Sequence, residues 1–231
     1  MQPIVIWFGL NGILLLVDYL LGSLPMGYLL GRLLKGIDIR EYGSGSTGAT
    51  KVLRTLGKGP GLLVLLVDVG KGALAIALIN WAYASASWFN GPVSATVDRA
   101  LWFPWIVILG GLAAILGHSK SIWLNFTGGK SVATSLGILL AMHWPVGLAI
   151  LGIFSIVLAL SRIVSLSSIT AALALPLLMG LMAQPLPYVL FAIAGGIYVI
   201  WRHWSNIQRL LAGTEPRLGQ NQPAIETEKV S

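Results

Sequence analysis

Long runs of residues without a formal charge constrain this sequence more than any other feature. Asp18 is the only charged residue between Ile4 and Gly31, and the intervals 131–161 and 163–201 contain no Asp, Glu, Lys or Arg. A helix that crosses the ~30 Å hydrocarbon core of a bilayer needs about 20 apolar residues. Charged residues make up only 10% of the chain and hydrophobic residues 56%, so the polar side chains are too few to cover a soluble particle. The sequence therefore predicts an all-α integral membrane protein.

Two of these runs are longer than one span requires, and each contains a proline break. Residues 143–145 divide the run 131–161 into two short spans, and residues 184–187 divide the run 163–201 into two of ordinary length. One long tilted helix is the alternative for the shorter run. We predict a single membrane domain (1–231) with seven transmembrane helices, at about 4–31, 61–87, 100–119, 131–144, 146–161, 163–183 and 186–202.

The basic residues indicate the orientation of these spans, because cytoplasmic loops carry an excess of Lys and Arg. Six of the 15 basic residues lie within 32–58, which we therefore place inside. If 131–161 formed one span, Arg217 would lie outside, whereas two spans return the tail 203–231 to the cytoplasm. The N-terminus is then outside and the C-terminus is cytoplasmic. Residues 1–17 have no basic segment before their apolar run, so we assign them to the first span and not to a cleaved signal.

The unusual polar residues gather in segments that this topology places on the cytoplasmic side. These segments are rich in Gly, Ser or basic residues, and they comprise 37–54, 125–134, 162–169 and 202–209. Small residues let backbone amides approach an anion closely, and Arg54 and Lys130 add positive charge. Together these features predict the binding of phosphate groups.

Two of the segments resemble nucleotide-binding motifs but lack the required context. Residues 43–48 match G-x-G-x-x-G, yet a dinucleotide fold needs a preceding strand, and the neighbours here are predicted membrane spans. Residues 128–131 end like a Walker A loop, but its first glycine would fall on Leu124. We interpret both as phosphate-binding loops of another kind. The alternative is that the glycines form ordinary turns and the basic residues only determine topology.

Isolated ionisable residues have simpler interpretations. Asp18 lies within a span, where such a group is expected to be functional or paired. Asp68 and Lys71 are spaced i, i+3 and are expected to pair with each other. His118 is expected to be an interfacial side chain and not a catalyst, and His143, on the outer side, is expected to have no special role. With no Cys and three His in the chain, we predict no metal site.

In this combination, the polar segments resemble the bacterial acyl-phosphate:glycerol-3-phosphate acyltransferase family of small seven-span enzymes. The resemblance covers roughly 18–215, through the blocks 19–25, 43–54, 65–72, 128–134, 164–170 and 202–215 in the same order and spacing. It implies transfer of a fatty acyl group from acyl phosphate to glycerol 3-phosphate, giving lysophosphatidate and inorganic phosphate. It also implies a bacterial cytoplasmic (inner) membrane location, with the active site facing the cytoplasm. The expected partners are the two substrates and the lipid bilayer, with no cofactor, nucleic acid or obligate protein partner.

The resemblance also assigns site residues. It implies that the catalytic residues are Ser44, Arg54, Lys130, His203 and Asn206. It implies that the substrate phosphates are bound by Gly43, Gly45, Thr50, Gly128, Gly129, Ser165 and Ser168. The chain departs from the commonest family pattern at Ser46, Lys51, Ser131 and Trp204. Of these departures, Lys51 changes the chemistry most, because it adds a charge at a phosphate-binding loop.

Acyl phosphate is an activated anhydride, so we predict direct attack without an acyl-enzyme. The chain has no His-x₄-Asp pair, and its loops contain no obvious Ser-His-Asp triad. A transient nucleophile among Ser44, Ser165 and Ser168 is the alternative. Either His203 or the phosphate of the substrate could accept the hydroxyl proton.

Two other functional classes fit the sequence less well. A transporter of phosphorylated solutes would suit the glycine-interrupted spans, but the polar segments all lie on one predicted side, whereas alternating access needs a site reachable from both. A retinal protein needs a lysine in its last span, and no lysine occurs between Lys130 and Lys229. We therefore predict an enzyme and keep the transporter as the alternative.

Overall fold

The computed structural model describes residues 3–42, 45–85 and 97–220. Within these ranges the regular structure is helical, apart from an isolated bridge between Ser121 and Thr127. The helices are α1 (Pro3–Ser23), α2 (Met26–Lys35), α3 (Ala49–Leu56), α4 (Lys58–Ser85), α6 (Arg99–Ser119), α7 (Val132–Met142), α8 (Trp144–Ser161), α9 (Val164–Leu181), α10 (Leu186–Arg202) and α11 (Trp204–Leu211). Two short 3₁₀ turns, η1 (Ile39–Glu41) and η2 (Ile122–Leu124), complete the described elements. The all-α prediction is confirmed.

Length and apolar composition make five described stretches candidates for crossing a membrane, or six if the bent pair α10–α11 is counted. Helix α7 is apolar but falls below the length of these candidates. The count of seven spans and their orientation therefore stay predictions. One predicted span differs in detail, because the helix expected over 4–31 is interrupted at Leu24 and Pro25, between α1 and α2. Proline lacks the N–H that would continue the hydrogen-bond ladder.

Proline and capping residues explain the other helix ends. Helix α7 ends at Met142 and α8 begins at Trp144. Between them, His143 Nδ1 accepts a hydrogen bond from Val146 N (3.4 Å) and caps α8. Pro185 directly precedes α10. The break before α8 lies at 143, within the predicted segment 143–145, and the break before α10 runs over 182–185, which overlaps the predicted segment 184–187.

Helix α4 lies at the centre of the bundle, in contact with α1, α3, α6 and α7. Its approach to α7 depends on glycines, because a side-chain atom at Gly72 would overlap the carbonyl oxygen of Thr134. At Gly137 such an atom would overlap the carbonyl oxygen of Val69. Small residues of this kind let membrane helices pack closely. The close packing holds the beginning of α7, and with it Lys130, against α4.

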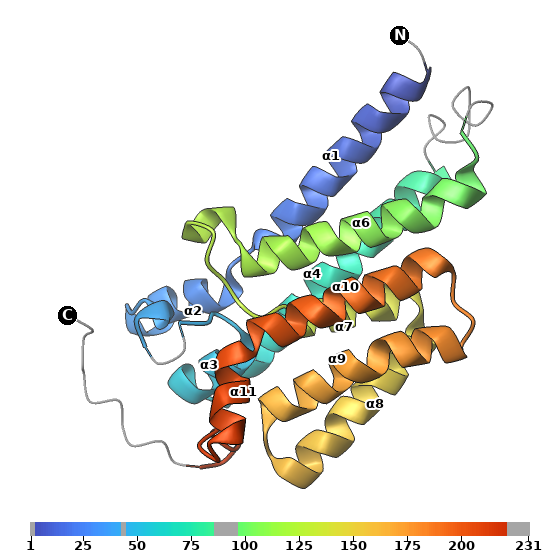
Figure 1. Ribbon diagram of the computed structural model, residues 1–231. Helices are drawn as coiled ribbons and strands as arrows, with labels where there is room; N and C mark the ends of the chain where they lie inside the picture. The colour runs from blue at the N-terminus through green and yellow to red at the C-terminus, as the bar shows by residue number, and fades with distance from the viewer. Residues whose placement is uncertain (1–2, 43–44, 86–96, 221–231) are drawn as a thin grey trace.

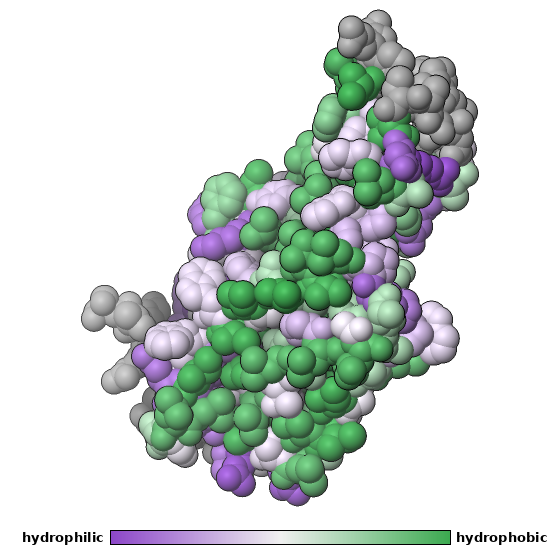
Figure 2. Space-filling model, turned by 45° about the vertical axis from the view of Figure 1, so that its right-hand side comes forward, coloured by the Kyte–Doolittle hydropathy of each residue, from purple (hydrophilic) through white to green (hydrophobic). Residues whose placement is uncertain are grey.

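The outer faces of α8 and α9 are strongly apolar. Leu160, Leu177 and Leu181 are each more than two-thirds exposed. Figure 2 shows hydrophobic side chains over much of one face of the molecule, while the most hydrophilic ones gather towards its margins. An exposed apolar surface of this extent is stable when lipid covers it.

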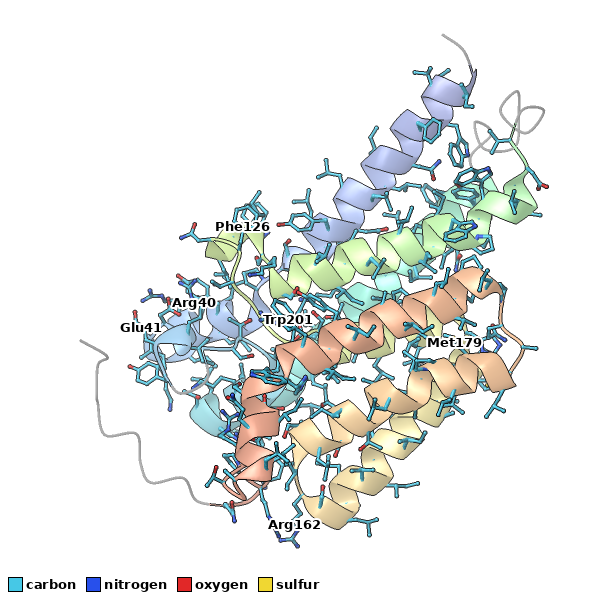
Figure 3. The ribbon with its side chains drawn as sticks, in the orientation of Figure 1. Arg40, Glu41, Phe126, Arg162, Met179 and Trp201 are labelled. Carbon is cyan, nitrogen blue, oxygen red and sulfur yellow. The ribbon has the colours of Figure 1, made fainter. Side chains whose placement is uncertain are left out.

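The two ends of the bundle differ in their elements. The short helices α2, α3 and α11 lie at one end, and the N-terminus of α1 lies at the other (Figure 1). Arg40 and Arg162 lie towards the first end, whereas Met179 lies towards the opposite end (Figure 3). The polar segments of the sequence thus meet at the end formed by α3 and α11.

Candidate active site

A cavity of about 400 Å³ reaches into the bundle from the end formed by α3 and α11. The polar or charged lining residues include Thr50, Arg54, Lys130, Ser165, Ser168, His203, Asn206, Arg209 and Glu215. The apolar lining residues include Leu139, Ile150, Phe154, Leu175 and Phe191. Ser165 and Leu175 are on the same helix, which places them about 15 Å apart along its axis. The cavity therefore has a polar mouth and an apolar interior.

The glycines of the turn before α7 fit against His118. The carbonyl oxygen of His118 accepts a hydrogen bond from Gly129 N at 3.2 Å. A side-chain atom at Gly128 would overlap this oxygen, and one at Gly129 would overlap the His118 imidazole. On its other side, the turn accepts hydrogen bonds from Arg202 Nη2, at 2.9 Å to Gly129 O and 3.2 Å to Gly128 O. Only glycine fits at both positions, and the turn holds Lys130 at the beginning of α7.

Ser131 follows this turn with φ +64°, in the left-handed region that favours glycine. This backbone conformation is a physical reason for the glycine that is commonest there in the resembled family. In this chain the Ser131 hydroxyl donates to the carbonyl oxygen of Ile115 at 3.0 Å. The buried hydrogen bond offsets part of the backbone strain.

Lys130 is half-buried at the polar mouth, and its ammonium donates to Asn206 Oδ1. Burial lowers the pKa of Lys130 to about 8, although the nearby Glu215 carboxylate opposes the shift. The ammonium therefore keeps its proton at neutral pH but loses it more readily than an exposed lysine. Lys130 can supply a positive charge to a bound anion.

Glu215 organises several side chains of the mouth. Its Oε1 accepts from Ser165 Oγ at 2.7 Å and from Asn206 Nδ2 at 2.6 Å, and its Oε2 accepts from Arg209 Nε at 2.7 Å. Burial raises the pKa of this carboxyl, but the three hydrogen bonds outweigh burial and leave its pKa below the usual value. Glu215 is thus a charged acceptor that fixes three side chains of the site.

Glu215 is not among the site residues predicted from the sequence, which places 203–231 in a cytoplasmic tail. Residues 204–211 form α11, and the chain then turns at Gly213 (φ +68°), which brings Glu215 to the cavity. Leu218 N also donates to the carbonyl oxygen of Arg162 at 2.7 Å. The only sequence signal for Glu215 was its position at the end of the resembled block 202–215.

His203 lies buried at the junction of α10 and α11. Its Nδ1 is 2.7 Å from the carbonyl oxygen of Val199, which can only accept, so Nδ1 carries the proton and Nε2 is the acceptor. Burial, reinforced by the charge of Lys130, lowers the pKa of His203 to about 4. The imidazole is therefore neutral at physiological pH and is a weak base.

The structure brings together most of the predicted site residues that it describes. Those that line the cavity are Thr50, Arg54, Lys130, Ser165, Ser168, His203 and Asn206. Gly128 and Gly129 shape the turn behind Lys130, and Gly45 does not line the cavity. Gly43 and Ser44 lie outside the described residues. Lys51 lines the cavity and donates to the carbonyl oxygen of Tyr42, so its added charge is partly directed to the backbone.

The isolated ionisable residues also have definite positions. Asp68 and Lys71 form the expected pair, with 2.9 Å between Oδ1 and Nζ. The interfacial location predicted for His118 is wrong, because this side chain is buried between Asp68 and the Gly129 turn. Its neighbours in sequence gave no sign of that packing. Asp18 is also buried, and neither of its carboxylate oxygens has a hydrogen-bond partner among the described residues.

Comparisons with known proteins give a consistent result. Residues 12–213 match the family described as glycerol-3-phosphate acyltransferase. The chain is 65% identical to the glycerol-3-phosphate acyltransferase of Acaryochloris marina (strain MBIC 11017), over 96% of this chain and 98% of the relative. It is also 65% identical to that of Nostoc sp. (strain PCC 7120), over 93% of this chain and 94% of the relative.

Solved structures show the same likeness. The fold is similar to the crystal structure of PlsY (YgiH), an integral membrane glycerol 3-phosphate acyltransferase, in its glycerol 3-phosphate form. That comparison has a TM-score of 0.77 and 36% identity, and covers 90% of this chain and 96% of the other. The lysophosphatidic acid form gives a TM-score of 0.75 and 35% identity, over 90% and 95%. Both likenesses extend over nearly the whole of each chain.

Proposed function

The chain belongs to the glycerol-3-phosphate acyltransferase family, and from this premise we propose that it transfers a fatty acyl group from acyl phosphate to glycerol 3-phosphate. The products are lysophosphatidate and inorganic phosphate. The protein is a multi-pass membrane enzyme, which suits a substrate with a long acyl chain.

The observation that carries this proposal is the change in polarity along one cavity. Cationic and hydroxyl side chains at the mouth suit phosphate groups, and Arg54 and Lys130 are proposed to hold them. The apolar interior suits the acyl chain, since a cavity of a few hundred Å³ can enclose a ligand of that size. The roles that the family resemblance implies are also proposed for Ser44, Thr50, Ser165, Ser168, His203, Asn206 and the loop glycines.

The proposed reaction is a direct displacement. The hydroxyl oxygen of glycerol 3-phosphate attacks the carbonyl carbon, and the bond from this carbon to the phosphate oxygen breaks. The departing phosphate keeps the electron pair and takes up the hydroxyl proton. The site contributes alignment of two bound substrates and positive charge near the phosphates.

The described hydroxyl groups support a route without an acyl-enzyme. Ser165 donates to Glu215, and Ser168 donates to the carbonyl oxygen of Val164 at 2.8 Å, so neither hydroxyl is directed at a histidine base. The low pKa of His203 also makes it a poor base at neutral pH. The leaving phosphate is a stronger candidate for the proton.

Kinetics with the purified enzyme test both the donor and the mechanism. Acyl phosphate should support acylation of radiolabelled glycerol 3-phosphate, whereas acyl-CoA should not. Initial-rate lines should intersect, as expected for a ternary complex. Parallel lines together with a trapped acyl-serine would overturn direct transfer, and activity with acyl-CoA alone would overturn the proposed donor.

We further propose that the single domain (1–231) spans the bacterial inner membrane seven times, with the N-terminus outside and the active site facing the cytoplasm. The gathering of basic segments around the polar mouth supports this orientation. Because the chain has no Cys, single cysteines at Asp98 and Arg217 can be labelled cleanly. An impermeant reagent added outside should label position 98 and not 217, and the reverse pattern would overturn the topology.

A further inference from the structure

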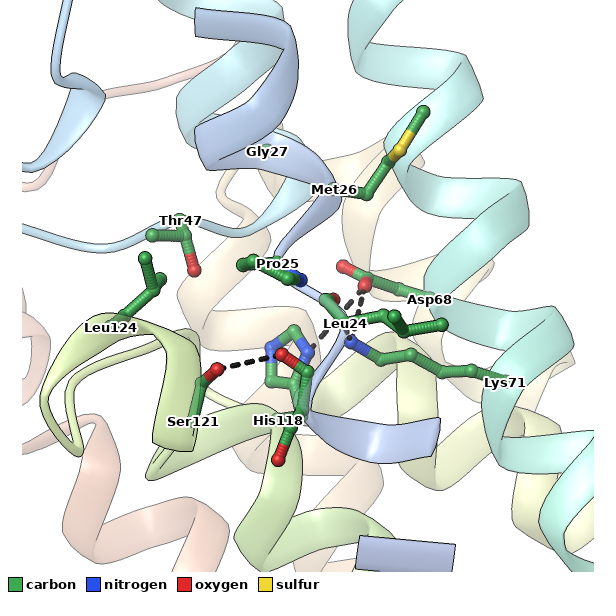
Figure 4. Close-up of a pocket in the computed structure, with 11 residues that line it drawn as sticks. Leu24, Pro25, Met26, Gly27, Thr47, Asp68, Lys71, His118, Ser121 and Leu124 are labelled. Atoms are coloured by element: carbon green, nitrogen blue, oxygen red, sulfur yellow. Dashed lines mark hydrogen bonds and ion pairs between the residues drawn. The ribbon is translucent and has the colours of Figure 1, made fainter. Parts of the chain in front are cut away.

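A buried cluster in the wall of the cavity has no part in the proposed chemistry, although two of its residues, Asp68 and His118, line the cavity. It consists of Asp68 and Lys71 on α4 and His118 at the end of α6, all of them buried. Asp68 Oδ1 lies 2.9 Å from Lys71 Nζ and 3.5 Å from His118 Nδ1 (Figure 4). The Asp68 carboxylate therefore contacts both Lys71 and His118 inside the bundle.

The cluster is also tied to the break between α1 and α2. Lys71 Nζ donates to the carbonyl oxygen of Leu24 at 3.2 Å, directly before Pro25. Ser121 Oγ donates to the carbonyl oxygen of Ser23 at 2.7 Å. A polar cavity of about 10 Å³, with room for about one water molecule, lies among these groups (Figure 4). The cluster thus connects α4 and α6 with the break between α1 and α2.

The imidazole of His118 connects the cluster to the Gly128–Gly129 turn of the site. It occupies the space in which a side chain at Gly129 would lie, with Nε2 nearest to that position. The His118 carbonyl oxygen accepts from Gly129 N, while Arg202 donates to the turn from its other side. Lys130 is the next residue along the chain. The position of its backbone therefore depends on His118.

Stability alone is a weak reason for such a cluster. Removing two charges from water costs several kcal/mol per ion, and well-packed apolar residues often replace a buried pair without loss of stability. Its contact with the glycine turn suggests a different role. Displacing a catalytic group by about 1 Å can lower a rate about 100-fold.

We propose that His118, held by Asp68 and Lys71, is a positioning residue that sets the Gly128–Gly129 turn and thereby places Lys130 at the substrate phosphate. This inference rests on the proposed function, since it assumes that Lys130 binds phosphate during acyl transfer. His118 lines the cavity, but the positioning role does not require it to touch substrate.

A double-mutant cycle tests this role. His118→Ala should lower kcat/KM for acyl transfer about 10- to 100-fold, because the turn loses its support. In a Lys130→Ala background, the same change should lower kcat/KM less than about 3-fold, because no ammonium remains to be positioned. His118→Gln, whose amide can still donate to Asp68, should retain more activity than His118→Ala.

The matched control is Tyr83→Phe, on the same helix as Asp68 but about 22 Å further along it. Any loss that it causes should be the same fold-change with and without Lys130→Ala. If His118→Ala does not yield folded protein, the same cycle is run with His118→Gln and judged by the same criterion. Folding is checked by detergent size-exclusion chromatography and thermal unfolding.

The outcomes separate this inference from the proposed function. Non-additive losses together with partial rescue by glutamine would support positioning. Equal losses in both backgrounds, with Lys130→Ala still strongly impaired, would overturn positioning and leave the proposed function intact. Full activity of Lys130→Ala would overturn the positioning inference together with the phosphate-binding role of Lys130, while acyl transfer itself would stand.

Discussion

Two polar clusters lie near opposite ends of the central helix α4, and they are built differently. At one end, Tyr83 donates to Asn11 Oδ1 at 2.8 Å, Asn11 Nδ2 donates to the carbonyl oxygen of Trp7 at 2.8 Å, and the Arg99 guanidinium lies 5.7 Å from the Tyr83 ring centre. These groups satisfy one another across α1, α4 and α6. They hold helices together and line neither of the described cavities.

At the other end, positive charge exceeds negative charge around a cavity. Its lining includes four basic side chains (Lys51, Arg54, Lys130 and Arg209) and two carboxylates (Asp68 and Glu215). Asp68 is paired with Lys71, which leaves Glu215 as the acceptor at the mouth. The groups around Tyr83 pair with one another away from the described cavities, whereas an excess of one charge facing a cavity indicates a ligand of the opposite charge. This difference explains why only one of the clusters is proposed as a site.

The largest expected difference between the clusters comes from removing a charge at the mouth. Lys130→Ala should lower kcat about 30- to 1000-fold, because loss of a charge-assisted contact removes about 2–4 kcal/mol of transition-state stabilisation. Acylation of radiolabelled glycerol 3-phosphate by the enzyme in detergent measures this change in kcat. The control is Lys58→Ala, an exposed lysine that does not line the cavity, which should retain near wild-type activity. Equal rates for both variants would show that Lys130 only determines topology.

Glu215→Gln tests whether the acceptor at the mouth organises the site. The amide should break the ion pair with Arg209 and weaken the hydrogen bonds from Ser165 and Asn206. We expect kcat/KM to fall about 10- to 100-fold, since charged hydrogen bonds contribute about 1.5–3 kcal/mol each. Glu226→Gln, outside the described residues, is the control for the charge change. A variant with unchanged kinetics would contradict the organising role of Glu215.

A pH profile tests which charged group of the site supports catalysis. With a pKa of about 8, Lys130 is protonated below this pH and loses its charge above it, so kcat/KM should fall as pH rises through about 8, approaching tenfold per pH unit. Lys130→Arg should move the decline to higher pH, because a guanidinium stays charged. His203, with a pKa of about 4, should produce no inflection between about pH 6 and pH 8. A decline at the same pH in Lys130→Arg would assign it to another group.

The structural cluster should respond in stability and not in catalysis. Tyr83→Phe leaves the buried Asn11 oxygen without its donor, which should lower the free energy of unfolding by about 1–2 kcal/mol. The value of kcat should stay within about twofold of wild type, because the cluster lies far from the cavity mouth along α4. Thermal unfolding in detergent, followed beside the activity assay, measures both. A fall in kcat with an unchanged free energy of unfolding would contradict the structural role of this cluster.

The smallest effect is expected at the residue where strain and hydrogen bonding nearly cancel. Ser131→Gly relieves a left-handed backbone, worth about 1–2 kcal/mol, but loses a hydrogen bond worth about 0.5–1.5 kcal/mol. Its stability should therefore stay within about 1 kcal/mol of wild type. Ser131→Ala keeps the strain and loses the bond, so it should be the less stable of the two. The reverse order in thermal unfolding would contradict this account of the departure from glycine.

The sequence alone determined what depends on neighbouring residues. Uncharged runs predicted the helices, and prolines predicted the segments in which α7 and α10 are separated from their neighbours. The family resemblance named Thr50, Arg54 and Lys130 before any geometry was available, and all three line the cavity. Such features are local, because periodicity, capping and motif spacing are properties of short segments.

Tertiary structure alone decided the contacts between segments that are distant in the chain. The hydrogen bond from Ser165 to Glu215 and the packing of His118 under Gly129 join residues on different elements. The left-handed backbone of Ser131 likewise follows from how the turn fits against α6. Sequence periodicity does not predict these contacts, because they form only after helix packing has placed the segments side by side. The sequence specified which groups the site can use, and packing determined which groups meet.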